Sequence, residues 1–158
     1  ELFAGKIRKI KELMPDAFIG VDVIVGTRGE TDEYFENAYE FIKGLDVSQL
    51  HVFSYSERPN TQALNIDYVV TPEVKHQRSQ RLLALSDEKT KAFYAKRIGE
   101  TMTVLMEKPK AGAPMHGFTD NYIRVEVESK PKLDNHLVKV CLGEFNEDET
   151  ALKGTIIE

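Results

Sequence analysis

Apolar residues follow a helical spacing near the N-terminus. Four of them recur three and four positions apart, which predicts an amphipathic helix over residues 6–14: Ile7, Ile10, Leu13 and Met14. Pro15 ends this pattern, because proline interrupts helical hydrogen bonding. Residues 18–25 then form a nearly continuous apolar run rich in β-branched side chains. This run predicts a strand covered on both faces, as in a parallel sheet.

The pattern then alternates between helix and strand. Thr31 is a suitable N-cap for a second helix, and Gly44 suits its C-terminal cap. Residues 47–55 predict a second strand, so the first part of the chain forms a βαβ unit preceded by a helix. Pro72 begins a long helical stretch to about residue 97, which Ser86 could interrupt by capping a new helix.

The hydrophobic period changes from 3.6 to 2 after Gly99. Four apolar runs follow, at residues 102–106, 123–127, 138–142 and 152–156, with turn-forming segments between them. Strands at this spacing predict a small antiparallel β-barrel. The predicted fold class is therefore α/β followed by all-β, with an α/β part at 1–70, a linking helix at 71–98 and a barrel at 99–158.

Charge narrows the range of partners. Residues 1–98 hold 14 Lys and Arg against 15 Asp and Glu, whereas residues 99–158 hold 7 against 11. A general basic coat for nucleic acid is therefore excluded, and any such contact must be local. No apolar run is long enough to span a bilayer and no secretory signal opens the sequence, so we expect a cytoplasmic protein without membrane contact.

A single cysteine limits the chemistry. Cys141 lies in an apolar run, which favours a core position over a role as ligand or nucleophile. One cysteine excludes both an internal disulfide and a self-contained iron–sulfur site. The sequence predicts no catalytic residue and no metal ligand within this chain.

Polar residues gather where the first predicted strand ends. Asp22 is a carboxylate in an apolar run, so either it has a hydrogen-bond donor or it faces a polar interior that holds a ligand. Gly26 could let a flat ligand lie against the backbone, or it could simply form a turn. Glu30 could accept a hydrogen bond from a sugar hydroxyl or amino group, or it could stabilise the start of the helix.

The second predicted strand adds aromatic and cationic groups. His51, Phe53 and Tyr55 share one face of this strand, and Arg58 follows its end. Such groups suit a purine nucleoside that carries a carboxylate. In the alternative interpretation, His51 is a hydrogen-bonded core histidine and Tyr55 an ordinary half-buried aromatic.

These two strands carry a resemblance to a known family. The segment Asp22-Val-Ile-Val-Gly26-Thr-Arg-Gly29-Glu30-Thr31 resembles the motif Asp-x-Ile-x-Gly-Phe-Pro-Gly-Glu-Thr of MiaB-like radical S-adenosylmethionine (radical SAM) tRNA methylthiotransferases. The segment from His51 to Thr61 resembles that family's Phe-x-Tyr-Ser-x-Arg-x-Gly-Thr, with Asn60 in place of glycine. The resemblance implies the last β/α units of an open (β/α) barrel, with Val25 and Gly26 against the adenosine of S-adenosylmethionine.

The remainder of the chain resembles the same family in the same order. The runs Gly117-Phe-Thr119-Asp-Asn121-Tyr122-Ile-Arg124-Val and Leu152-Lys-Gly154-Thr-Ile are similar to TRAM domains, which bind RNA. This implies contacts to a transfer RNA from four residues: Asn121, Tyr122, Arg124 and Lys139. The alternative is that these side chains form a solvated outer face of the barrel.

The resemblance identifies the chain as a C-terminal fragment of a tRNA methylthiotransferase, inactive by itself. The full-length enzyme would use S-adenosylmethionine and 4Fe-4S clusters to thiomethylate a modified adenosine beside the anticodon, and we expect neither cofactor in this fragment alone. Similarity at residues 120–125 favours threonylcarbamoyladenosine as the substrate. The expected partners are transfer RNA, the N-terminal part of the same protein, and another copy paired through an exposed strand edge. Two alternatives are a free-standing RNA-binding or docking module and an unrelated nucleotide-binding α/β domain.

Overall fold

The computed structural model describes residues 1–157 and divides into two compact units. The sheet unit comprises Glu1–Thr90, and the barrel unit comprises Lys91–Glu158. The boundary lies within a helix that contributes residues to both units.

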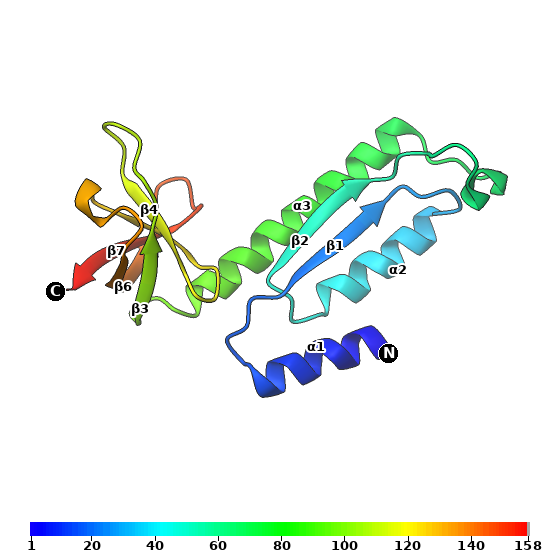
Figure 1. The fold of residues 1–158 in the computed structure, drawn as a ribbon. Helices are drawn as coiled ribbons and strands as arrows, with labels where there is room; N and C mark the ends of the chain where they lie inside the picture. Colours follow the sequence, from blue (N-terminus) through cyan, green and yellow to red (C-terminus); the bar gives the residue numbers. More distant parts are fainter. Residues whose placement is uncertain (158) are drawn as a thin grey trace. The chain divides into compact units, whose positions relative to one another are not determined.

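The sheet unit contains two parallel strands and the helices that pack on them (Figure 1). Its elements are α1 (Leu2–Leu13), β1 (Gly20–Val25), α2 (Asp32–Lys43), β2 (Gln49–Ser54), the 3-10 helix η1 (Gln62–Asn65) and α3 (Pro72–Ala95). The two strands are in register from Gly20 opposite Gln49 to Val25 opposite Ser54. The predicted order of helix, strand, helix and strand is confirmed, although α1 begins earlier than the apolar spacing indicated.

Only one face of this sheet is covered in the described chain. Val25 and Leu50 are buried in a core with helix residues such as Ile7, Phe35 and Leu82. On the opposite face, Asp22 and His51 are exposed, and Ile24 and Phe53 keep 57% and 53% of their surface. The prediction of a strand covered on both faces is therefore wrong for this chain, because the helices bury only the alternate residues of each strand.

The helix ends follow local capping rules in part. The Thr31 side chain accepts a hydrogen bond from the Tyr34 backbone N–H at 3.2 Å, which confirms the predicted N-cap. Gly44 is the C-cap of α2, but with a right-handed backbone, φ −76°, so it does not use the freedom of glycine. α3 continues through Ser86 without a break, because the Ser86 hydroxyl bonds to the Leu50 backbone instead of capping a new helix.

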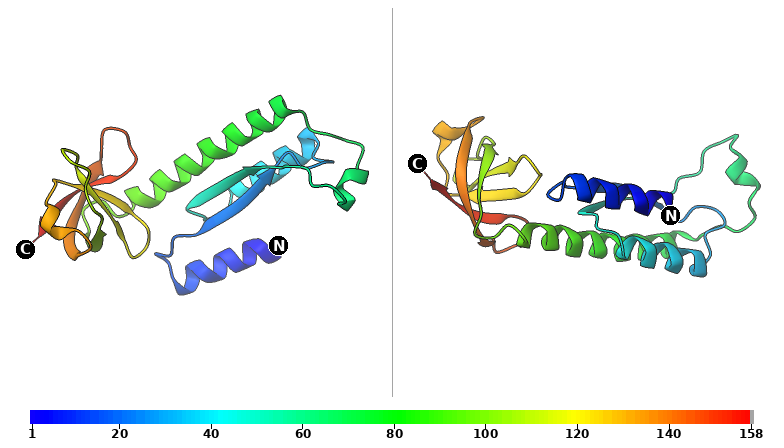
Figure 2. Two further views of the ribbon diagram at one scale, coloured as in Figure 1. Left: turned by 45° about the horizontal axis from the view of Figure 1, so that its top comes forward. Right: turned by 90° about the horizontal axis from the view of Figure 1, so that it is seen from below.

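The barrel unit is a small β-barrel (Figure 2). It is closed, and its five strands pair in the order β3-β4-β5-β7-β6. The strands are β3 (Thr101–Met106), β4 (Met115–Thr119), β5 (Arg124–Val127), β6 (Leu137–Phe145) and β7 (Leu152–Ile157), with the 3-10 helix η2 (Pro131–Leu133) before β6. Its interior holds fully buried apolar side chains, among them Val104, Met115, Val125 and Leu142. The predicted fold class, α/β followed by a small β-barrel, is confirmed. Two details differ from the prediction: β4 is an additional strand, and β5 pairs with β7 in parallel, so the barrel is mixed and not purely antiparallel.

Two residues of this unit show why the hydrophobic pattern gave wrong predictions for the barrel strands. A Cβ atom at Gly117 in β4 would lie 2.4 Å from the Leu105 carbonyl oxygen, so a glycine occupies this inward position and the apolar alternation of a strand is missing there. Cys141 is half-buried and not part of the core. Its neighbours Val140 and Leu142 are the buried residues of β6, and alternation therefore points Cys141 outward.

Candidate functional site

The loop after β1 is held by an internal carboxylate. The Gly26 backbone N–H donates to Glu30 Oε2 at 2.7 Å, and Arg78 Nη1 donates to the same oxygen at 2.6 Å. Arg78 also donates to Asp32 Oδ1 at 2.6 Å, and its side chain is only 4% exposed. Burial by itself lowers the pKa of Arg78, but the hydrogen bonds to Asp32 and Glu30 outweigh it, and the pKa is raised overall. Through these contacts, Glu30 stabilises the loop between β1 and the start of α2.

Gly26 is explained by its backbone and by Lys75. Its φ is +80°, a region that favours glycine. A Cβ atom there would lie 2.4 Å from Cγ of Lys75, whose ammonium group donates to the Tyr55 carbonyl at 3.2 Å. The same ammonium group lies 5.5 Å from the centre of the Tyr55 ring. The structure therefore supports a turn at Gly26, while the predicted ligand contact stays a prediction.

Arg28 is a residue that the sequence interpretation missed. Its Nε donates to Glu57 at 2.7 Å, and Nη1 donates to the carbonyls of Leu64 and Ile66 at 2.9 and 3.0 Å. The hydrogen bond from Arg28 lowers the pKa of Glu57, and the same bond raises the pKa of Arg28. Arg28 thus ties the segment after β2 to the loop after β1. No local pattern marks this role, because all three partners lie 29 to 38 residues away.

The exposed face of the sheet brings some of the predicted residues together. Asp22 and His51 are register partners on β1 and β2, and both are exposed, so the interpretation of His51 as a core residue is wrong. Val25, in contrast, is 1% exposed and its carbonyl accepts from the Tyr55 N–H at 2.9 Å. Val25 therefore offers almost no surface to a ligand in the described chain, and its predicted contact stays a prediction. Arg58 is exposed in the loop after β2, outside this strand pair.

The barrel unit presents an exposed aromatic turn. Tyr122 has a left-handed backbone, φ +64°, and 65% of its surface is exposed. Its ring centre lies 6.2 Å from that of Phe118. Asn121 Oδ1 accepts from the Thr119 hydroxyl at 2.7 Å, and the Tyr94 hydroxyl donates to the Tyr122 carbonyl at 3.2 Å. Burial raises the pKa of Tyr94. Asn121 and Tyr94 thus brace a turn whose aromatic side chain is largely exposed.

Arg124 joins this turn through strand pairing. Arg124 of β5 is the register partner of Phe118 of β4. Phe118 is also the register partner of Leu105 of β3, and Leu105 is in turn the register partner of Leu137 of β6. Leu105 and Leu137 are 46% and 70% exposed. We refer to the row formed by these four residues as the outer row. Lys139 is exposed two positions after Leu137 in β6, so it points to the same side of its strand. The sequence interpretation found Arg124 but missed the three apolar members of the row.

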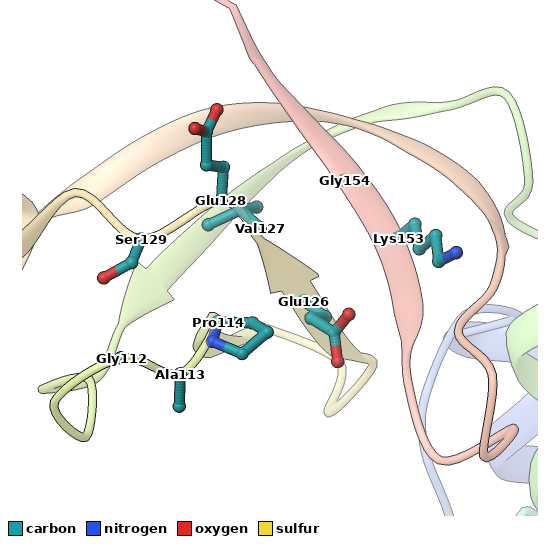
Figure 3. A pocket seen from close by; sticks show the side chains of 9 residues that line it. All are labelled: Gly112, Ala113, Pro114, Glu126, Val127, Glu128, Ser129, Lys153 and Gly154. Atoms are coloured by element: carbon teal, nitrogen blue, oxygen red, sulfur yellow. The ribbon is translucent and has the colours of Figure 1, made fainter.

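A hollow of about 610 Å³ lies elsewhere on the barrel unit. Its charged lining residues are Glu126, Glu128 and Lys153 (Figure 3). Glu126 and Lys153 are register partners on β5 and β7. Two carboxylates against one ammonium group do not suit an anionic ligand.

Metal binding finds no support in the described residues. Within residues 1–157, no three His, Cys, Asp or Glu side chains come together in a way that could hold a metal ion. Cys141 is the one cysteine of the sequence, whereas an iron–sulfur cluster requires several cysteine ligands. The residues present therefore do not fit an iron–sulfur cluster. Over the same residues, the helices are too short or too polar to cross a bilayer.

Fold and site together define a class of protein, in which parallel β/α units are followed by a small closed barrel with an exposed aromatic turn. No protein-family model matches the chain. It is 36% identical over 144 residues to the threonylcarbamoyladenosine tRNA methylthiotransferase of Bacillus subtilis, covering 89% of this chain and 32% of that protein. It is 33% identical over 158 residues to the tRNA-2-methylthio-N(6)-dimethylallyladenosine synthase of Aliarcobacter butzleri, covering 99% and 36%. The Desulfitobacterium hafniense protein of the latter name is 32% identical over 148 residues, covering 92% and 33%.

The chain is a homologue of the C-terminal part of tRNA methylthiotransferases. It spans about a third of the length of the curated relatives that it matches.

Proposed function

We propose that this chain acts as the C-terminal part of a tRNA methylthiotransferase. The observation that carries the proposal is sequence identity of 33–36% along nearly the whole chain, through both units in order. The exposed sheet face supports it, because Ile24 and Phe53 lie where a strand of a larger sheet would be covered. An N-terminal part of the same protein is the partner that would cover this face.

In this proposal the sheet unit contributes one wall of the S-adenosylmethionine site. Asp22 and the backbone at Val25 and Gly26 line the β1 side of that wall, and Tyr55 and Arg58 the β2 side. Glu30 acts indirectly by holding the Gly26 N–H. The cofactor would supply the radical chemistry together with 4Fe-4S clusters, which this chain lacks the cysteines to hold. The chain alone is therefore expected to be inactive.

The barrel unit, in this proposal, contacts transfer RNA. Tyr122 and Phe118 offer aromatic faces on which an unpaired base can stack, and Arg124 and Lys139 offer cations for the backbone. Asn121 shapes the turn through its bond with Thr119. The favoured substrate is a transfer RNA with threonylcarbamoyladenosine beside the anticodon, and the Bacillus subtilis relative bears that modified base in its name.

A chimera tests the activity. The matched third of the Bacillus subtilis methylthiotransferase is replaced by this chain, and methylthio nucleosides in transfer RNA are measured by mass spectrometry of hydrolysates. We expect 2-methylthio-threonylcarbamoyladenosine, and loss of the product when Tyr122→Ala and Arg124→Ala are combined. A folded chimera that yields no methylthio nucleoside would count against the proposed function. The dimethylallyl product in its place would reassign the substrate.

A free-standing RNA-binding module is the second candidate. The closed barrel with its exposed Tyr122 and the outer row favours it, because these features need no catalytic partner. Transfer RNA binding by residues 1–158, combined with a chimera that folds but lacks activity, would favour this candidate over the enzyme part.

A further inference from the structure

A second, smaller hollow on the barrel unit carries an unusual share of its positive charge. Its volume is about 230 Å³, and the segment 107–114 between β3 and β4 forms much of its lining, together with His116 and Arg124. This volume is below the range of about 300–1,000 Å³ that is typical of pockets for whole small molecules. The hollow is therefore suited to one chemical group of a larger ligand.

The charges in this hollow oppose those of the unit around it. Residues 99–158 contain 7 Lys and Arg, and three of them line the hollow: Lys108, Lys110 and Arg124. The same residues contain 11 Asp and Glu, of which Glu107 lines it. Cations concentrated at one place on an acidic unit create a local positive potential, which attracts an anion.

Arg124 is the strongest single indication of a ligand. Its Nε is buried, and no hydrogen-bond acceptor meets it in the described part of the chain. A buried donor without an acceptor costs about 1–3 kcal/mol. The guanidinium group also lacks an ion pair with any residue of 1–157, as do Lys108 and Lys110. Because Nε itself has no accessible surface, an anion in the hollow would first meet the part of Arg124 that lines the hollow and would reach Nε only after a movement of the side chain.

Glu126, a carboxylate that contacts the lining residue His116, is already engaged. Glu126 Oε2 lies 3.2 Å from His116 Nε2 and accepts from the Asn146 amide at 2.9 Å. Glu126 therefore has partners of its own, so Glu107 is the one carboxylate among the lining residues beside the three cations.

We propose that this hollow binds a phosphate group of the transfer RNA backbone, with Arg124 at its base and Lys108 and Lys110 at its rim. The inference rests on the proposed function and adds a specific anchor to it. Arg124 is also a member of the outer row, beside Phe118. A phosphate in the hollow would place the adjoining nucleotide near the aromatic pair of Phe118 and Tyr122.

The test measures transfer RNA binding by residues 1–158 across a range of salt concentrations. Two variants remove the proposed contacts: Arg124→Gln, and the double variant Lys108→Gln with Lys110→Gln on the exposed loop. The matched control, Lys130→Gln with Lys132→Gln, removes the same number of charges from exposed positions outside the hollow. We expect the first two to weaken binding about tenfold and to flatten the slope of log K against log salt by about one, because one phosphate contact is lost. The control should change neither quantity by as much.

A second measurement separates the two sources of phosphate. The Arg124 Nε–H resonance is followed by NMR while inorganic phosphate or transfer RNA is added. A shift with transfer RNA supports the proposal. Transfer RNA binding that neither hollow variant weakens beyond the control would overturn the hollow and the RNA contact of Arg124, and would leave RNA binding by the rest of the barrel unit and the proposed enzyme part standing. If inorganic phosphate shifts the resonance but transfer RNA does not bind, both the RNA anchor and RNA binding are wrong. If neither ligand acts, the hollow is not an anion site and RNA binding fails with it.

Discussion

Arg78 is the residue on which the loop after β1 depends. It is 4% exposed and donates to Glu30 and Asp32, both at 2.6 Å. Arg78→Gln would leave the carboxylate of Glu30, only 15% exposed, without its charged partner. We expect a loss of about 3 kcal/mol in the free energy of unfolding, since breaking a buried pair leaves an uncompensated charge. Urea unfolding followed by helical circular dichroism measures it.

Arg81→Gln is the control for that prediction. Arg78 and Arg81 both lie over the Phe35 ring, 5.2 and 5.0 Å from its centre. Arg81, however, pairs with an exposed Glu36, so its loss should cost less than about 1 kcal/mol. Equal losses for the two variants would show that the buried pair has no special weight.

Side-chain roles were predictable where the cause is local. The Thr31 cap needs only the first turn of its own helix. Glu30 was assigned two possible roles, and the choice depends on Arg78, 48 residues away. A core position was predicted for Cys141 because the surrounding run is apolar. Which residues of β6 are buried, however, depends on its register with β3 and β7, and the run itself carries no information on that register. Long-range partners therefore limit prediction at this scale.

At the scale of elements, the Ser86 side chain hydrogen-bonds α3 to the backbone of β2. The Leu50 N–H donates to Ser86 Oγ at 2.8 Å, and that hydroxyl donates to the Leu50 carbonyl at 3.1 Å. Ser86→Ala should destabilise the chain by about 2 kcal/mol, because two buried backbone groups lose their partner while the helix gains only about 0.5 kcal/mol in propensity. Thermal or urea unfolding measures the change.

Ser79→Ala serves as the comparison in the same helix. Ser79 is half-buried, and its hydroxyl takes part in none of the hydrogen bonds between residues 1–157. We expect a change within about 0.5 kcal/mol. A Ser86 variant as stable as the Ser79 variant would show that the contact to β2 contributes nothing.

The segment after β2 should respond to acid through Glu57. The hydrogen bond from Arg28 lowers the pKa of Glu57 in the folded chain. The stabilisation is therefore fully present above the ordinary glutamate pKa of about 4.3 and is lost as the pH falls through the lower, folded value. We expect hydrogen-exchange protection of the Gly29 amide, which donates to Tyr68 at 2.9 Å, to decrease on acidification.

Two variants isolate the contribution of Glu57. Glu57→Gln should reduce Gly29 protection at neutral pH and weaken its dependence on acid. Glu36→Gln removes another carboxylate whose pKa is lowered, through Arg81, and should leave Gly29 protection as in the original sequence. If the protection of Gly29 changes with pH identically in all three proteins, Glu57 is not the responsible group.

Elements were predictable to the extent that their residues carry a period. Both parallel strands, all three long helices and four of the five barrel strands follow from hydrophobic spacing. β4 was not predicted, because its inward positions include Gly117 and Thr119 and so lack a regular apolar alternation. The closeness of Gly117 to the Leu105 carbonyl is a contact between strands, which spacing within one strand does not reveal.

At the scale of the whole molecule, the features that the sequence did not predict depend on which strands pair with one another. The parallel contact of β5 with β7 closes the barrel, and it joins Val125 to Leu152 across 27 residues. A series of short strands with turns predicts hairpins and therefore an antiparallel barrel. The sheet unit shows the same limit, since the apolar run at 18–25 signals burial by strands or helices that the described chain does not supply.

That uncovered face leads to a prediction about self-association. β1 pairs on one edge with β2, and its other edge has no partner in the two-stranded sheet of residues 1–157. Ile24 of this strand is 57% exposed on the uncovered face. An unpaired apolar edge strand favours pairing with another chain, so we expect concentration-dependent dimers in sedimentation velocity. Ile24→Lys should weaken dimerisation at least tenfold with little loss of stability, because a charge at this position opposes edge pairing. Leu83→Lys, at a residue 44% exposed on α3, changes the charge equally and should leave dimerisation intact. A chain that stays monomeric at high concentration, or two variants that behave alike, would exclude the β1 edge as the contact.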